Sequence, residues 1–172
     1  MDIFIEEIVE RKRTLVQGLA SIGVILLSVL IAFIFMTFLP IVLPMLSWLM
    51  PLFVVGVFYL AYRLVVSQNV EFEYSMVNTE IDVDKIINRK NRKRLTTVRV
   101  TGLEARGFCG SEKNEFNRYI SDIAVKKIYA AAERNSESNY FVVYMADSVK
   151  TMLIFSPSEK IINNIEKLSP KR

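Results

Sequence analysis

Two hydrophobic patterns divide the chain. Residues 14–62 contain no Asp, Glu, Lys, Arg or His, whereas apolar and polar side chains alternate with a period of two from residue 70 onward. A single helix over the uncharged stretch would be roughly 74 Å long at about 1.5 Å per residue, more than twice the ~30 Å hydrocarbon core of a bilayer. The stretch therefore predicts two transmembrane helices, at about Leu15–Leu39 and Met45–Val66. They are joined by a short turn near Pro40 and Pro44, which lack amide donors.

The alternation after residue 69 predicts a β-hairpin with a two-residue turn at Asn78–Thr79. Its inward face consists of Val70, Phe72, Tyr74, Met76, Ile81 and Val83. Further strands are expected at about 95–100, 101–107, 124–133, 138–146 and 149–156. The segment 107–122 reads as a polar loop with at most one helical turn, and residues 89–94 as the connection before the third strand.

The last segment predicts an amphipathic helix. Ser156 is placed as its N-cap, Pro157 as its first residue and Glu159 as the capping-box acid. Four apolar residues then recur at helical spacing, which gives the helix one face to bury against the sheet. They are Ile161, Ile162, Ile165 and Leu168.

Residues 2–13 place Ile5, Ile8 and Val9 on one helical face. Two interpretations stay open for this segment: an amphipathic helix in the membrane interface, or an extension of the first span. The predicted organisation is thus a cytoplasmic amphipathic segment at 1–13, a helical hairpin at 14–67 and a cytoplasmic domain at 68–172.

Positive charge flanks both predicted spans on one side. Arg11, Lys12 and Arg13 precede the first span, Arg63 ends the second, and the connecting turn has no charge. Positive flanks remain in the cytoplasm, so we expect a multi-pass protein of the cell membrane with both termini cytoplasmic. A cleaved signal peptide does not fit, because the apolar run is too long and no small-residue cleavage site follows it.

About seven predicted strands followed by one amphipathic helix is the order of a pleckstrin-homology-like (PH-like) domain. The chain resembles a bacterial family of small membrane proteins in which a two-helix hairpin precedes such a domain. The stretches that carry the resemblance are VEFEYSMVNTEIDVDKI, RKRLTTVRVTGLEARG and the terminal strand and helix. The resemblance implies an α+β fold: a transmembrane hairpin plus a small antiparallel β-barrel or sandwich, capped by the C-terminal helix. It implies no activity.

The composition argues against an enzyme. The chain has no histidine, one cysteine and neither of the common glycine-rich phosphate-binding loops. Triads, Cys-His dyads and histidine-containing zinc sites are therefore excluded. Cys109 lies between glycines in GFCGSEK, but no histidine is available to activate it, so we interpret it as an inert loop residue. We expect no catalytic residue, cofactor or metal.

The sequence RKNRKR at 89–94 is the candidate binding feature. Its cations are Arg89, Lys90, Arg92, Lys93 and Arg94. Near anionic lipid each cation contributes about 1 kcal/mol, so the run would supply at most roughly 5 kcal/mol. The run has no aromatic residue, which argues against nucleic acid. PH domains that bind phosphoinositides carry cations around the first hairpin turn, and VNTE has none. Nonspecific docking to anionic phospholipid or a solvated basic turn remain.

The first hairpin also raises the question of a cation site. A two-residue turn at Asn78–Thr79 places Glu73 opposite Asp84 and Ser75 opposite Asp82, and facing carboxylates need neutralisation. A divalent cation is one solution for Glu73, Asp82 and Asp84. The commoner way to neutralise such carboxylates is pairing with Arg99 or a lysine of the adjacent strand, or simple solvation.

These observations favour a non-enzymatic, membrane-anchored interaction or scaffold module with an unidentified protein partner. Sensing of an anionic lipid surface through residues 89–94 is the first alternative. The second is an accessory subunit of a larger membrane complex, in which the small residues Ser28 and Ala32 pack against other helices.

Overall fold

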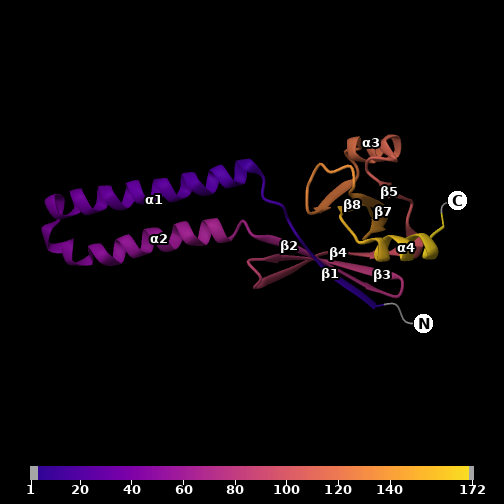
Figure 1. Cartoon of the computed structure of the whole chain (residues 1–172), viewed down its shortest axis with the longest axis horizontal. Coiled ribbons are helices and arrows are strands. Elements are labelled where there is room, and N and C mark those ends of the chain that lie inside the picture. The colour runs from indigo at the N-terminus through magenta and orange to yellow at the C-terminus, as the bar shows by residue number, and fades with distance from the viewer. Residues whose placement is uncertain (1–3, 171–172) are drawn as a thin grey trace. The chain divides into compact units, whose positions relative to one another are not determined.

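The structure is a computed structural model that describes residues 4–170. Its fold is α+β, with four helices and two β-sheets in the described residues (Figure 1). The chain forms two compact units: residues 13–69 are helical, and residues 4–12 together with 70–170 form the second, sheet-containing unit. The second unit thus contains chain from both sides of the first.

The helical unit contains α1 (Leu15–Val42), a short 3-10 segment η1 (Pro44–Leu49) and α2 (Met50–Val66). By length and composition, Leu15–Val42 and Pro44–Val66 are each able to cross a membrane. The two apolar helices are therefore present as predicted. The reversal lies later than expected, because α1 continues through Pro40 and ends only before Leu43. Pro51 lies in the first turn of α2, where its missing donor is tolerated.

Small side chains allow α1 and α2 to approach each other. Ser28 and Ala32 of α1 and Ala61 of α2 are buried, while most large apolar side chains of both helices are exposed. Phe35 and Phe53 stack across the pair with ring centroids 5.7 Å apart. Ser28 and Ala32 are thus used where α1 packs against α2 within this chain.

The sheet-containing unit has two four-stranded sheets that are not closed into a barrel. The first sheet is antiparallel, with strand order β1 (Phe4–Glu10), β2 (Val70–Val77), β3 (Glu80–Ile87) and β4 (Asn91–Arg99). The second has the order β5 (Ala105–Phe108), β7 (Tyr140–Ala146), β8 (Val149–Phe155) and β6 (Lys126–Ala130). The remaining elements are η2 (Val100–Gly102), α3 (Lys113–Ser121) and α4 (Glu159–Leu168).

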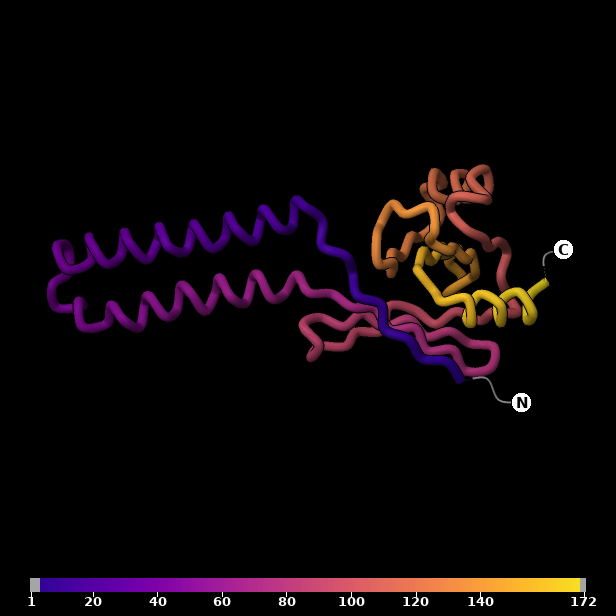
Figure 2. The backbone as a smooth tube through the Cα atoms, viewed as in Figure 1, coloured from indigo at the N-terminus to yellow at the C-terminus, as the bar shows by residue number. Residues whose placement is uncertain are grey.

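The prediction of a helix over residues 2–13 is wrong for the described part of that segment. Phe4–Glu10 is a strand that pairs with β2 from Phe4↔Val77 to Glu10↔Glu71, and Figure 2 shows the N-terminal segment beside β2. Ile5 and Val9 face the core, whereas Ile8 faces out, although all three share a helical face. The open edge of β2 accounts for the difference. Pairing along this edge satisfies the backbone N–H and C=O groups of both strands, whereas a short isolated helix would be only marginally stable.

Several other boundaries also differ from the sequence predictions. The loop predicted at 107–122 contains the nine-residue helix α3. Strand β6 pairs with β8 in parallel, so the second sheet is mixed. Helix α4 begins after Ser158, two residues later than predicted, and the Ser158 amide donates a hydrogen bond to Oε1 of Glu7 at 2.9 Å. A carboxylate of β1 thus satisfies an amide at the start of α4, where acidic groups are favourable.

The main core lies between the sheets and α4. Tyr74, Val83, Val142 and Phe155 are at most 1% exposed, and the stripe predicted on α4 joins them through the fully buried Ile161 and Ile165. The Tyr74 hydroxyl donates to the Ala130 carbonyl of β6 and accepts from the Ser156 amide at 3.3 Å. A smaller cluster on the other face of the second sheet packs beneath α3.

The orientation of β1 gives a direct test of the strand. Val9→Ser should lower the free energy of unfolding by about 1–2 kcal/mol because it removes core contact, whereas Ile8→Ser should change it by less than ~0.5 kcal/mol. The measurement is urea unfolding of the full chain in detergent. Unfolding is detected by the labelling of Cys109, the chain's one cysteine, which is buried in the folded protein. Equal effects of the two substitutions would restore the helical interpretation.

Candidate functional site: the outer face of the first sheet

The basic run is mostly strand rather than connection. Only Arg89 and Lys90 lie in the turn between β3 and β4, and β4 already begins at Asn91. Asn88 and Arg89 have φ angles of 54° and 53°, the left-handed geometry with which the chain reverses between Ile87 and Asn91. The remaining cations therefore lie in strand β4, where successive side chains point to opposite faces of the sheet.

A β-bulge decides which way they project. The pairing changes from Val83↔Thr96 to Asp84↔Arg94, which leaves Leu95 as an extra residue of β4. Without it, Arg94 would lie opposite Lys85 on the inner side of the sheet. Because a shift of one residue exchanges the faces of a strand, the bulge puts Arg92 and Arg94 on the outer face with the acids of β2 and β3.

The carboxylates of the first hairpin are paired with these arginines. The predicted register is confirmed, with Glu73 opposite Asp84. Arg92 forms an ion pair with Glu73. Arg94 lies 3.2 Å from Oδ1 of Asp84 through Nε and 3.0 Å from Oδ2 of Asp82 through Nη2. Arg92 thus reaches past β3 to an acid of β2, and Arg94 pairs with two acids of the adjacent β3.

Arg89 and Arg99, at the two ends of the same face, each pair with acids of this sheet. Arg89 bridges two strands, with Nε 2.8 Å from Oε1 of Glu71 and Nη2 3.0 Å from Oε1 of Glu10. The hydrogen bond to Glu71, followed by that to Glu10, raises the pKa of Arg89. Arg99 pairs with Glu80 at 3.1 Å, so it is not the partner of the central carboxylates that the sequence suggested.

Two of these acids are buried although they lie on an outward face. Glu73 is 5% and Asp84 7% exposed. Burial raises the pKa of Glu73; the nearby Arg92 opposes this shift, while Glu6 and Asp84 add to it. In the described residues no group of three or more His, Cys, Asp or Glu side chains is arranged to hold a metal ion. In this structure arginines pair with these carboxylates, Thr97 also donates a hydrogen bond to Oδ1 of Asp82 at 2.6 Å, and Glu6 hydrogen-bonds to Glu73.

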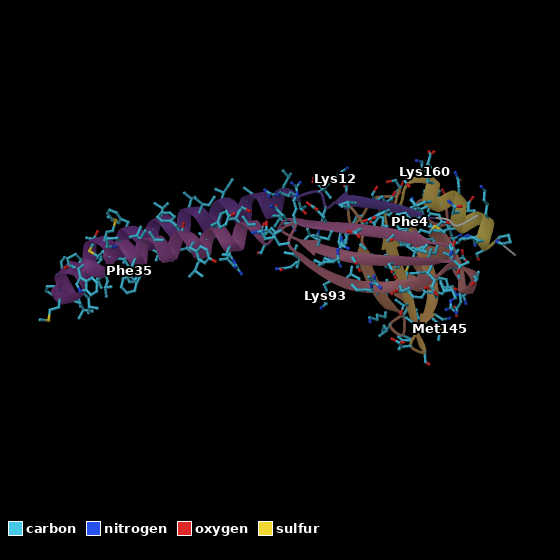
Figure 3. All side chains as sticks on the ribbon, turned by 90° about the horizontal axis from the view of Figure 1, so that it is seen from below. Phe4, Lys12, Phe35, Lys93, Met145 and Lys160 are labelled. Carbon is cyan, nitrogen blue, oxygen red and sulfur yellow. The ribbon has the colours of Figure 1, made fainter. Side chains whose placement is uncertain are left out.

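The five cations of the run therefore fall into two classes. Arg89, Arg92 and Arg94 are engaged by carboxylates, whereas Lys90 and Lys93 are exposed and form no ion pair within residues 4–170. Lys93 projects from the sheet into solvent (Figure 3). Two lysines thus carry the uncompensated charge of the run.

The residues expected to set membrane orientation lie around the helix ends. Arg13 donates a hydrogen bond to Oδ1 of Asn69, and Arg63 Nη1 lies 3.5 Å from the Tyr59 hydroxyl. Lys12 belongs to the sheet-containing unit, where its Nζ lies 3.3 Å from Oε2 of Glu133. Arg11 donates its backbone amide to the Val70 carbonyl, 3.0 Å away.

Sequence reasoning missed Glu10 and Glu71 as arginine partners. Glu71 alternates correctly in its strand, but Glu10 joins the same face only because β1 pairs with β2 across an insertion. Cys109 is buried, and burial raises the pKa of its thiol to about 11, which suppresses the thiolate.

A family model described as a bacterial PH-like domain (DUF6106) matches residues 1–172. No curated protein and no solved structure matches the chain.

The division of the run into arginines and lysines predicts different costs of substitution. Arg92→Met should destabilise the protein by about 1–2 kcal/mol, because the buried Glu73 loses its counter-charge. The cost is kept to this size because Arg92 itself is exposed, so that solvent screens its charge. Lys93→Met is the matched control and should change stability by less than ~0.5 kcal/mol. The measurement is the urea midpoint of each variant. An equal loss of stability in Arg92→Met and Lys93→Met would refute the pairing of Arg92 with Glu73.

Glu73 also predicts a pH dependence. Because its folded-state pKa is raised above the ordinary 4.5, the folded protein holds this proton more tightly than the unfolded chain does. Its contribution to stability is full below pH 4.5 and is lost as the pH rises through the raised pKa. The stability of wild type minus that of Glu73→Gln should therefore fall as the pH rises from 4.5 to 8. A flat or rising difference would contradict the buried carboxyl.

Proposed function

We propose, on the premise that the chain belongs to this family of bacterial PH-like domains, that it is a non-enzymatic interaction module anchored in the membrane. In this proposal α1 and α2 form a transmembrane hairpin, both termini are cytoplasmic, and the PH-like unit binds a protein partner at the membrane surface. The observation that carries the proposal is the position of the helices within the chain, between two paired strands of one sheet.

The anchor is supported by composition and connectivity together. Both helices expose large apolar side chains over most of their surface, as lipid-facing helices do. The chain leaves the first sheet after β1 and returns at β2, where the Arg11 amide meets the Val70 carbonyl at 3.0 Å. An anchor attached through two short connections raises the effective concentration of the domain for anything else at the membrane.

The charge pairing supports a protein partner over a lipid surface. Arg89, Arg92 and Arg94 already hold five carboxylates, so docking to lipid would have to compete with existing ion pairs. The PH-like fold supplies sheet edges and loops that suit protein recognition, although this argument rests on fold analogy.

Lipid docking remains the alternative, and the exposure of Lys90 and Lys93 is the observation that favours it. Two lysines supply about 2 kcal/mol at most, well below the value for the whole run. The accessory-subunit alternative would use the exposed apolar faces of α1 and α2, since Ser28 and Ala32 are buried.

The proposed topology is tested with single cysteines in a Cys109→Ser background. Ser47→Cys lies in the segment between the helices and should react with a membrane-impermeant maleimide on intact cells. Lys90→Cys should react only after the membrane is permeabilised. Labelling of both positions from the same side would overturn the hairpin.

The partner class is tested with the full chain in nanodiscs of neutral lipid, incubated with anionic vesicles at 20 and 200 mM salt. The interaction module predicts no vesicle capture, together with site-specific photo-crosslinks from the PH-like unit to protein in cells. Lipid docking predicts capture that weakens at the higher salt and is lost in Lys90→Gln/Lys93→Gln. Arg99→Gln, paired with Glu80 outside the run, is the matched charge control.

A further inference from the structure

A cavity of about 300 Å³ lies within the sheet-containing unit, beside the point at which the chain leaves this unit for α1. Its walls are formed by Arg11, Phe72, Tyr129, Ala131 and Arg134. Two of these five residues are arginines, and none is an acid. The cavity is separate from the outer face of the first sheet, since none of residues 89–94 lines it.

Backbone hydrogen bonds fix the segments that carry the two arginines next to each other. The amide of Arg11 donates to the Val70 carbonyl at 3.0 Å, and the amide of Lys12 donates to the Ala132 carbonyl at 2.8 Å. Ala132 precedes Arg134 by two residues in the loop after β6. Arg11 and Arg134 thus come from distant parts of the sequence and line one small cavity.

An aromatic side chain holds the guanidinium of Arg134. Its Cζ lies 4.5 Å from the centre of the Tyr129 ring, which is a cation–π contact. Tyr129 belongs to β6 and pairs with Ile154 of β8, so the ring is attached to a regular part of the second sheet. The contact uses the charge of the guanidinium and leaves its N–H donors available for an acceptor in the cavity.

The acids that adjoin these arginines in the sequence are engaged by other cations. Glu10 pairs with Arg89 at 3.0 Å, Glu133 with Lys12 at 3.3 Å and Glu137 with Lys113 at 2.8 Å. Neither Arg11 nor Arg134 forms an ion pair in the part of the chain that the structure describes. The cavity therefore presents two guanidinium groups and no carboxylate.

This combination favours an oxyanion with several acceptor atoms. A phosphate group meets the requirement best, because a guanidinium donates two parallel hydrogen bonds to it. We propose that the cavity binds a phosphate group, which accepts hydrogen bonds from Arg11 and Arg134. The volume is at the lower end of the range for small-molecule sites, so it suits a phosphate with a few adjoining carbon atoms. The glycerophosphate headgroup of a lipid and a soluble phosphomonoester share this chemistry.

The position of Arg11 in the chain makes a lipid headgroup accessible. Arg11 lies four residues before Leu15, the first residue of α1, so their backbones are at most about 14 Å apart however the two units are arranged. Only this headgroup source rests on the proposed membrane anchor, because a soluble phosphomonoester needs no bilayer. The binding test below uses detergent and the topology test uses neither arginine, so failure of one leaves the other intact.

The binding test is isothermal titration calorimetry of the full chain in nonionic detergent. The probes are inorganic phosphate, glycerol phosphate and dihexanoyl phosphatidylglycerol, with acetate and glycerol as controls. At least one phosphate compound should bind saturably and at least tenfold more tightly than acetate. Tighter binding of the lipid would identify a headgroup site, and equal or tighter binding of glycerol phosphate a site for a soluble phosphomonoester. No saturable binding of any phosphate compound at millimolar concentration would overturn the proposal.

Variants test the two guanidinium contacts. Arg11→Gln and Arg134→Gln should each weaken binding of the phosphate compound at least tenfold. Lys90→Gln/Lys93→Gln is the matched control, because it removes two exposed cations outside the cavity, and it should leave binding unchanged. Unaltered binding in either arginine variant would overturn the assignment of that residue. Loss of binding in the lysine variant would show attraction to net charge alone and would overturn the proposal.

Protection of Cys109 distinguishes loss of the site from loss of the fold. Cys109 is buried and does not line this cavity, so it should stay unreactive toward maleimide in every folded variant. Arg11→Lys and Arg134→Lys keep the charge without the planar guanidinium, and they remain informative where a glutamine variant unfolds. Each should bind phosphate more weakly than wild type but more tightly than the glutamine variant. The reverse order of the lysine and glutamine variants would overturn the proposal.

Discussion

Antiparallel pairing of β1 with β2 is the interaction on which the rest of the molecule depends. It joins strands that are separated in sequence by residues 11–69, and so it closes the chain around the entire helical unit. The entropic cost of closing a loop grows only slowly with its length, so the pairing of the two strands can offset the cost of this long insertion. The same pairing brings Glu10 to Arg89 and Glu7 to the amide of Ser158, the N-cap residue of α4.

This topology has a consequence for how the unit is defined. The sheet-containing unit is incomplete without Phe4–Glu10, because a segment beginning after α2 would leave the edge of β2 open and Ile5 and Val9 missing from the core. An exposed edge of this kind invites nonspecific pairing with other chains. Studies of the domain in isolation therefore need both pieces of the chain.

The two arginine environments show how differently one residue type is used. On the outer face a bulge aligns Arg92 and Arg94 with acids, and the resulting ion pairs neutralise buried Glu73 and Asp84. On the inner side of the second sheet, Arg106 is buried and hydrogen-bonds to Tyr140. The first arrangement gives carboxylate partners to three cations of a run for which the sequence left lipid docking and a solvated turn both open.

Local features of the chain determined the elements that depend on local physics. Hydropathy alone located the two apolar helices, the Asn78–Thr79 turn placed Glu73 opposite Asp84, and the spacing of Ile161 and Ile165 gave the buried face of α4. Only the tertiary structure decided that Phe4–Glu10 is a strand, that β6 runs parallel to β8, and that the arginines of the basic run face carboxylates. Each of these depends on backbone groups or charges brought together from distant parts of the chain, and neither periodicity nor composition records which distant partner is present.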